Sequence, residues 1–327
     1  MEALTTRRRM LAAMAACAFA PRAAFAAAAF PVRTVRIVVP YSVGIGPDLV
    51  ARALAERLAQ RWGQSVIVDN KPGASGIVAF AEVRNAPPDG HTLFVGDTAT
   101  LAVNPLIHAS LPYDPARDLV PISLLFRATF LILVSSKSRY ATVAEMLADA
   151  RQQPGKVSYA SLGNGHPTQM CVETLARAAN VSLLHVPFKE AGALFTSVAL
   201  GDVDFTVFGL NSASGYLKGG KLKALAVAAP ARLPEAPDIP TIVEAGGPAV
   251  EMRPWAALVG VAGTPPAVLT AIQHEVVDAL AAPAVRGRIE AAGFDVTPST
   301  PQQLTARIDA DVKLYTALVR EGRVRGD

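Results

Sequence analysis

Short apolar runs alternate with amphipathic segments along most of the chain. Apolar runs rich in β-branched residues predict strands at 34–39, 65–69 and 92–95. Between them, apolar residues recur at helical spacing over 48–61 and 77–85, and the connections are short. Strands that alternate with helices in this way predict an α/β fold with helices flanking mostly parallel sheets.

A second alternating series follows two extended segments between residues 119 and 135, which break near Arg127. In this series, helices are predicted at 142–152, 167–178, 191–200 and 212–218, and strands at 157–160, 183–186, 205–208 and 222–228. The proline-rich stretch 230–248 predicts a linker, a strand returns at 253–261, and helices at 266–281 and 301–319 should pack on the first series. We therefore expect one lobe of residues 27–127 and 252–327, and another of residues 128–251 that includes the return linker.

The first 26 residues have the pattern of an export signal. Three successive arginines, Arg7 to Arg9, precede an apolar run that ends at Ala20, and small residues precede position 27. The arginines fit the twin-arginine route as well as the ordinary secretory route, and Cys17 offers a weaker site for lipid attachment. Cleavage after Ala26 predicts an exported mature protein.

Charge and cysteine content narrow the function further. Removal of residues 1–26 takes away four arginines and one glutamate, so the formal net charge falls from +4 to +1. No basic stripe with interleaved aromatic residues remains, which argues against nucleic-acid binding. After the signal, no apolar run reaches the roughly 18 residues of a membrane span. Cys171 is then the one cysteine left, and the histidines lack metal-binding spacing, so we expect no disulfide and no bound metal.

Two small-residue loops at the carboxyl ends of predicted strands are candidates for a binding cleft. Gly44 and Gly46 follow the first strand, and Asp48 follows them in the first turn of a helix. The segment 161–167 repeats this arrangement in the second lobe. Exposed amides at a strand-to-helix turn favour anions, and ligands of open parallel sheets lie at strand ends. The loops predict a cleft that holds a carboxylate from both sides, and ordinary βα turns without a ligand are the alternative.

An ordered set of motifs resembles the periplasmic solute receptors of tripartite tricarboxylate transporters, the Bug proteins. The matching segments are 36–40 with Gly44, Gly46 and Asp48, then 63–68, 70–74, 88–90, 104–105, 111–114, 159–165, 185–189, 201–204, 220–227 and 262–265. The resemblance implies a type II periplasmic-binding-protein fold with two lobes and a ligand cleft between them. It implies a receptor, and not an enzyme, that acts as a monomer without a cofactor. This receptor would pass a small carboxylate to the integral membrane permease subunits of a tripartite transporter.

The resemblance also implies which residues hold the ligand. They are Tyr41, Ser42, Val43, Gly44, Ile45, Gly46, Asp48, Thr98, Thr100, Ser161, Asn164, Gly165, His166, Lys189 and Asn211. The chain departs from the family at this place, because Ser42 and Val43 replace two prolines and Ile45 replaces a glycine. Pro47 replaces a hydroxyl residue, and Gln169 stands where histidine is common. The identity of the acid therefore does not transfer from a relative, and a bulkier or less polar acid is an option.

Two other functions stay open. One is an exported α/β enzyme such as a hydrolase, but Ser161 lacks the context of a nucleophile elbow and is expected to donate a hydrogen bond instead. The other is a receptor that reports its ligand to a sensor kinase. The pair Gly44 and Gly46 does not complete a dinucleotide-binding fingerprint, because Leu49 stands in place of the third glycine.

Overall fold

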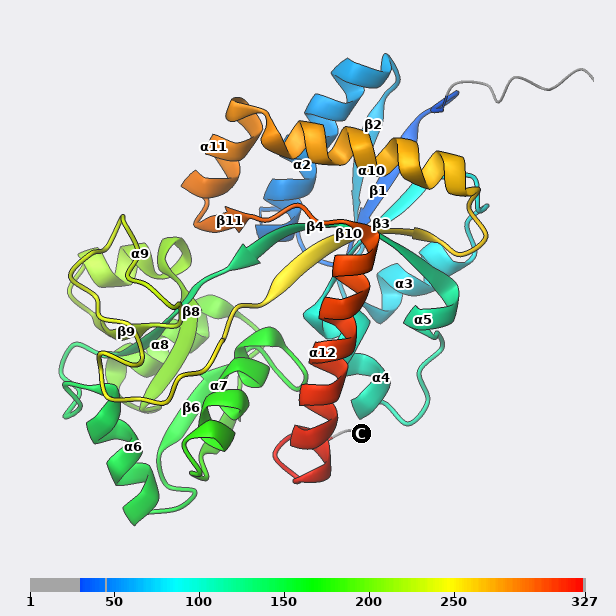
Figure 1. Ribbon diagram of the computed structural model, residues 1–327. Coiled ribbons are helices and arrows are strands. Elements are labelled where there is room, and N and C mark those ends of the chain that lie inside the picture. The colour runs from blue at the N-terminus through cyan, green and yellow to red at the C-terminus, as the bar shows by residue number, and fades with distance from the viewer. Residues whose placement is uncertain (1–29, 45, 326–327) are drawn as a thin grey trace, which may run out of the picture.

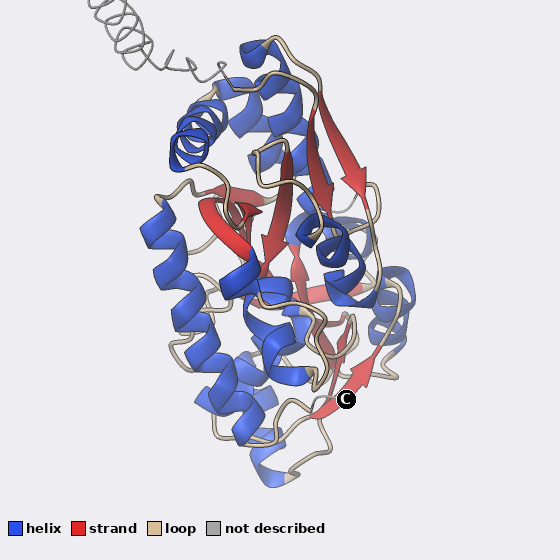
Figure 2. Ribbon diagram, turned by 90° about the vertical axis from the view of Figure 1, so that its right-hand side faces the viewer, coloured by secondary structure: helices blue, strands red, loops and turns tan. Residues whose placement is uncertain are grey.

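The structure is a computed structural model that describes residues 30–44 and 46–325. The predicted signal, Cys17 and Ile45 lie outside the described residues. The described chain forms two lobes, each built on one β-sheet with helices on both faces (Figures 1 and 2). This arrangement confirms the predicted two-lobed α/β fold.

The first sheet has six strands in the order β11-β4-β10-β3-β1-β2. Their bounds are β1 (Val35–Val39), β2 (Val66–Asn70), β3 (Thr92–Asp97), β4 (Leu119–Ala128), β10 (Trp255–Val261) and β11 (Phe294–Val296). β1 pairs in parallel with β2 and β3, whereas β10 runs antiparallel to both β3 and β4, and β11 antiparallel to β4. The sheet is therefore mixed: the parallel pairing predicted for the first strands is present among β1, β2 and β3, and antiparallel pairs join β10, β4 and β11 to them.

The second sheet is also mixed. It has the order β7-β6-β8-β5-β9, with β5 (Phe130–Ser135), β6 (Ser158–Ser161), β7 (Leu184–Pro187), β8 (Phe205–Gly209) and β9 (Leu222–Val227). β6 is parallel to β7 and β8, but β5 is antiparallel to β8 and β9. The antiparallel pairs have a topological cause. β4 carries the chain toward the second lobe and β10 follows its return, so neighbouring strands at the crossing run in opposite directions.

The helices of the first lobe enclose its sheet in two layers. Their bounds are α2 (Gly46–Trp62), α3 (Ile77–Arg84), α4 (Asn104–Ile107), α5 (Pro115–Asp118), α10 (Pro266–Ala281), α11 (Pro283–Ala291) and α12 (Pro301–Arg320). Alternate residues of β1 face opposite layers, because side chains alternate along a strand. Ile37 packs in the core with Leu54 of α2 and Ile272 of α10, while Val38 packs with Phe80 of α3 and Leu304 of α12.

The second lobe repeats this layering. Its helices are α6 (Val143–Gln152), α7 (Pro167–Ala178), α8 (Ala191–Leu200) and α9 (Leu210–Lys218). Ile132 of β5 packs with Leu175 of α7 on one face, and Leu133 packs with Leu194 of α8 on the other. Each core is thus closed by helices that its own lobe supplies.

α12 contacts both lobes, and Figure 1 shows it in red beside α4 and α7. Its last turns form an apolar cluster with Met170 of α7 and Val103 of the first lobe, to which α12 contributes Leu318. Beyond the helix, Arg323 donates to the Val181 carbonyl at 2.9 Å. No single described helix is long and apolar enough to cross a membrane; α10 and α11 meet that test only as a pair that bends by 70°.

Candidate functional site

Asp48 organises the first predicted loop from within. Its buried carboxylate accepts hydrogen bonds from the Gly44 amide at 2.8 Å, Arg52 Nε at 3.0 Å and Asn70 Nδ2 at 2.9 Å. Burial by itself would raise the pKa of Asp48, but the bonds from Arg52, Gly44 and Asn70 outweigh it and lower the pKa. Asp48 therefore holds the loop in its conformation, and the Gly44 amide donates to Asp48 within the loop.

The tip of the first loop is exposed. Ser42, Val43 and Gly44 face solvent, and Val43 is 69% exposed. Gly46 starts α2 where a Cβ atom would overlap the ring of Phe294, so glycine is needed for this close approach. The predicted ligand residue Ile45 lies between them, outside the described residues.

Tyr41 joins the first loop to the end of β3. Its hydroxyl donates to the Asp97 carboxylate, and the amide and hydroxyl of Thr100 donate to the same side chain, each at 2.8 Å. Burial raises the pKa of Asp97, although the bonds from Tyr41 and Thr100 oppose that shift. Thr98 is buried nearby, and its hydroxyl accepts the Trp255 amide at 3.3 Å. Both predicted threonines thus make internal bonds at the end of β3.

Asp97 joins two of the predicted residues, Tyr41 and Thr100, and the sequence reasoning did not select it. It is the last residue of a strand whose six residues are all buried, and a small loop follows it. A carboxylate at the carboxyl end of a buried strand was a usable signal, because such ends carry ligand sites in α/β folds.

Backbone amides of the second loop also donate hydrogen bonds to nearby side chains of the same lobe. Leu162 N donates to Thr168 Oγ1 at 3.1 Å, Gly163 N to Ser161 Oγ at 3.1 Å, and Gly165 N to Gln169 Oε1 at 2.7 Å. The predicted outward-pointing amides are therefore engaged within the loop at these positions. The exposed side chain of this loop is Asn164.

Ser161 forms a chain of hydrogen bonds with a defined direction. Because Gln169 accepts the Gly165 amide through Oε1, its Nε2 faces His185 Nδ1, at 3.2 Å. His185 Nδ1 must then accept, so its Nε2 carries the proton and donates to Ser161 Oγ at 2.6 Å. The Ser161 hydroxyl in turn donates to the Gly163 carbonyl at 3.2 Å. A serine nucleophile needs histidine as acceptor, so this polarity disfavours catalysis.

His166 caps α7. Its Nδ1 accepts the Thr168 amide at 3.2 Å and lies 2.8 Å from the Thr168 hydroxyl. Burial lowers the pKa of His166 to about 4, so the ring is neutral at pH 7 and can accept these bonds. His166 was predicted to contact the ligand, and its ring also has a structural role as the cap of α7.

The two loops rest on one segment of the first lobe, residues 97–107. Tyr41 bonds to Asp97 at its start, and Gly165 contacts its end, where a Cβ atom would lie 2.5 Å from Ile107 Cδ1. Within the described residues, no hydrogen bond links the first loop directly to the second. The segment includes a π-helix, Ala99–Val103, which is frequent at functional sites.

The remaining two predicted residues lie outside these loops in the sequence. Lys189 is exposed, and no ion pair joins it to a described residue. Asn211, at the start of α9, donates to the Ala291 carbonyl of the first lobe at 2.8 Å. It lines a cavity of about 450 Å³ together with Thr129 and Phe294. Asn211 therefore bridges the lobes.

Metal binding has no support in the described part of the chain, where no group of three or more His, Cys, Asp or Glu side chains is placed to hold an ion. Cys171 is buried, and burial raises the pKa of its thiol above the usual range. An inert thiol of this kind packs as a small apolar side chain.

Comparison with known proteins places the chain in a family. The profile described as the tripartite tricarboxylate transporter family receptor matches residues 50–323. A protein of the tcbD-tcbE intergenic region of a Pseudomonas species is 32% identical over 323 residues, which cover 98% of this chain and 96% of that protein.

Solved structures with bound ligands are similar over most of the chain. An R. palustris protein with adipate has a TM-score of 0.80 and 28% identity, covering 91% of this chain and 100% of that chain. MatC from Rhodopseudomonas palustris with bound malate has a TM-score of 0.76 and 31% identity, covering 89% and 100%. The chain belongs to the tripartite tricarboxylate transporter receptor family and is a solute-binding receptor of the Bug type.

Proposed function

We propose that this receptor binds a small dicarboxylate between its lobes in the periplasm and delivers it to the permease subunits of a tripartite transporter. Support for the ligand class comes from the two similar receptors, which hold adipate and malate. Support for the location is the export-signal pattern of residues 1–26. The lobes are residues 27–127 with 252–327, and residues 128–251.

One observation of the structure supports a ligand between the two loops. The first loop and the second loop, which belong to different lobes, both contact segment 97–107. The first loop exposes Ser42, and the second loop exposes Asn164. The proposed ligand set is the one that the family resemblance implies, from Tyr41 to Asn211. Because the Gly44, Gly163 and Gly165 amides are engaged, side-chain groups and ordered water supply much of the contact.

Calorimetry with the purified chain of residues 27–327 tests the ligand class. The panel contains malate, adipate, citrate and an amino acid without an acidic side chain. We expect saturable binding of at least one dicarboxylate, and at ligand one hundred times Kd a stabilisation of about 2.7 kcal/mol. No saturable heat or melting shift from any carboxylate would refute the proposal.

Matched variants test the site. Ser42→Ala and Lys189→Ala should each weaken dicarboxylate binding about 3- to 30-fold, because each removes one polar contact. Ser182→Ala and Lys218→Ala remove the same groups from exposed positions outside the ligand set and should keep the wild-type Kd. Equal Kd values in all four variants would place the ligand elsewhere.

Transport is tested separately in cells. Uptake of the labelled dicarboxylate should be lost when either the receptor or the permease is deleted, and a plasmid copy should restore it. Uptake that survives deletion of the receptor would contradict delivery, although binding in the calorimeter would still stand. Turnover of p-nitrophenyl acetate should not exceed that of a Ser161→Ala variant, since the bond polarity around Ser161 disfavours a nucleophile.

A further inference from the structure

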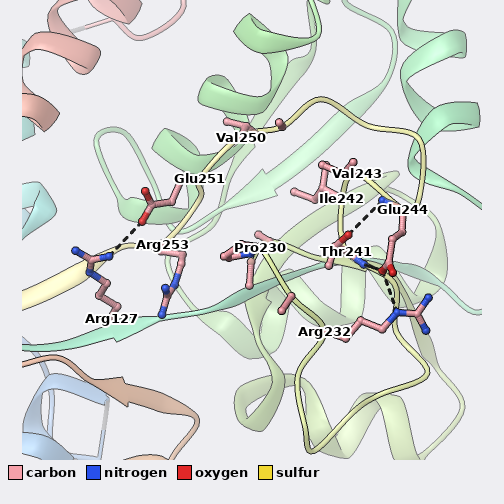
Figure 3. Close-up of a pocket in the computed structure, with 14 residues that line it drawn as sticks. Arg127, Pro230, Arg232, Thr241, Ile242, Val243, Glu244, Val250, Glu251 and Arg253 are labelled. Atoms are coloured by element: carbon pink, nitrogen blue, oxygen red, sulfur yellow. Dashed lines mark hydrogen bonds and ion pairs between the residues drawn. The ribbon is translucent and has the colours of Figure 1, made fainter.

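A second cavity, of about 930 Å³, lies where the chain passes between the lobes (Figure 3). It is lined by Arg127, Ala228, Ala229, Pro230, Ala231, Arg232, Thr241, Ile242, Val243, Glu244, Ala249, Val250, Glu251 and Arg253. None of these residues belongs to the proposed dicarboxylate site. The volume is within the range of small-molecule sites, roughly 300–1,000 Å³.

Strand pairing brings two arginines into this cavity from distant parts of the sequence. Arg127 lies near the end of β4, where Trp255 of β10 is its register partner. The Pro254 carbonyl accepts the Ala128 amide at 2.7 Å beside them. Arg253 therefore lies next to Arg127 at the crossing, and Figure 3 shows both side chains at one end of the cavity.

Both guanidinium groups keep buried donors unused. Each carries five N–H donors. Arg127 makes one long bond, from Nη1 to Glu251 Oε1 at 3.4 Å, and Arg253 bonds through Nη2 to Asp295. Among the described residues, neither Arg127 Nε nor Arg253 Nε has a hydrogen-bond partner, although both atoms are buried. A buried donor without an acceptor costs about 1–3 kcal/mol, so an acceptor is expected here.

The charges around Arg127 also favour an added anion. Glu251 is half exposed and is shared by Arg127 and by Arg307 of α12, which lies 3.5 Å from it. Burial lowers the pKa of Arg127, and the nearby charges of Arg307 and Arg253 lower it further. Asp311, also on α12, forms an ion pair with Arg307 at 3.2 Å. Asp311 does not line the cavity. At this end of the cavity, Arg127 has one long bond to Glu251, and Arg253 is paired with Asp295, which does not line the cavity.

The rest of the cavity has a different character. At the other end of the cavity, Arg232 is paired with Glu244 at 2.9 Å and donates to the Pro237 carbonyl. The Arg232 guanidinium group therefore already has a carboxylate partner. Eight of the fourteen lining residues are alanine, proline, isoleucine or valine. A ligand that fills the space would therefore place an anionic group on Arg127 and Arg253 and an apolar body on this wall.

We propose that this cavity is a second binding site, which takes a small organic oxyanion with an apolar body. Arg127 and Arg253 hold its anionic group, and the wall around Pro230 and Ile242 covers its apolar part. Planar guanidinium groups suit this task because each can donate two parallel hydrogen bonds to one oxyanion. The site is independent of the dicarboxylate cleft.

Nitrogen-15 NMR of the arginine side chains tests the proposal at the atoms that carry it. The probe is phenyl phosphate, which combines a dianionic head with an apolar ring, and inorganic phosphate is the comparison. We expect the Nε–H signals of Arg127 and Arg253 to shift together and saturably with phenyl phosphate. Inorganic phosphate should bind at the same signals about tenfold or more weakly, since it lacks the apolar body.

Variants complete the test. Arg127→Gln and Arg253→Gln should each weaken phenyl phosphate binding at least about tenfold, whereas Arg33→Gln, an equal loss of charge at an exposed position, should not. Circular dichroism and melting curves establish that each variant is folded. If Arg127→Gln does not fold, Arg127→Lys serves instead, since it keeps the charge and loses the fork, and about a threefold weakening is expected.

Three outcomes would overturn the proposal. One is no saturable shift of the two Nε–H signals. Another is binding that shifts other signals but leaves Arg127 and Arg253 unmoved, which would place the probe in a different site. The third is equal affinity in the wild type and in the folded variants of Arg127 and Arg253.

Discussion

Acidification should destabilise the second lobe through His166. Burial lowers the pKa of this ring from an ordinary value of 6.5 to about 4, and the neutral ring caps α7. In the unfolded chain the ring regains its ordinary pKa, so between pH 4 and 6.5 the unfolded state binds more protons. The free energy of unfolding therefore rises with pH across this window and falls on acidification.

The magnitude follows from the size of the shift. A difference of 2.5 pKa units at about 1.36 kcal/mol per unit gives about 3 kcal/mol between pH 7 and pH 4. His166→Asn removes the titration but keeps a good cap, because an asparagine oxygen can accept the same amide. The variant should therefore lose about 3 kcal/mol less than the wild type when the pH falls from 7 to 4.

Urea unfolding of the chain of residues 27–327 at half-unit pH steps measures this difference. Other titrating groups contribute equally to wild type and variant and cancel in the comparison. His274→Asn, at a side chain that is 69% exposed on α10, is the matched control and should keep the wild-type slope. Parallel pH profiles for the wild type and His166→Asn would refute the reasoning, as would an NMR titration of the His166 ring with a midpoint near 6.5.

Three further substitutions test packing and buried polar groups by urea unfolding at pH 7. Gly165→Ala should cost about 2–4 kcal/mol, because the added Cβ atom clashes with the first lobe and the backbone has a positive φ of 71°. The control Gly155→Ala, at φ 73° with nothing within 4 Å, should cost only about 1 kcal/mol. Equal losses in the two variants would contradict the contact between the lobes. Asp48→Ala should cost about 1–3 kcal/mol because it removes the buried acceptor of the bonds from Gly44, Arg52 and Asn70, whereas Glu56→Ala, from an exposed ion pair, should cost less than about 1 kcal/mol. Tyr41→Phe should cost about 1–3 kcal/mol, and more at pH 8 than at pH 5, because its buried carboxylate partner is harder to ionise without the hydroxyl. A loss that does not grow with pH would contradict that coupling.

Local patterns predicted the elements well where the period is long and clear. The predicted helices 167–178, 191–200 and 266–281 match α7, α8 and α10 in both bounds. By contrast, α11 and the three-residue strand β11 were not predicted. Their segment is too short and too mixed in polarity to show a period, and its structure depends on packing against α2 and β4.

The chemistry of the site depended on contacts that no local pattern contains. The amides of the second loop were expected to face a ligand, yet Thr168 and Gln169 fold back from the next helical turn to accept two of them. Arg127 and Arg253 are separated by 126 residues, and only the register between β4 and β10 places them together. Sequence spacing cannot show such pairings, because they are set by tertiary structure.

The last helix gives the molecule a strut between its halves. Leu304 fixes its first turn in the core of the first lobe, while Glu321 beyond its end pairs with Arg177 of α7 at 2.8 Å. The attachment of α12 to α7 depends partly on this exposed ion pair, which contributes at most about 1 kcal/mol. The ion pair can therefore break easily while the first turn of α12 stays packed in the first lobe. When the lobes separate, α12 should move with the first lobe and lose its contacts with α7. Opening the receptor would also have to break the apolar cluster of Leu318 with Met170, the Arg323 bond to the Val181 carbonyl and the Asn211 bond to the Ala291 carbonyl.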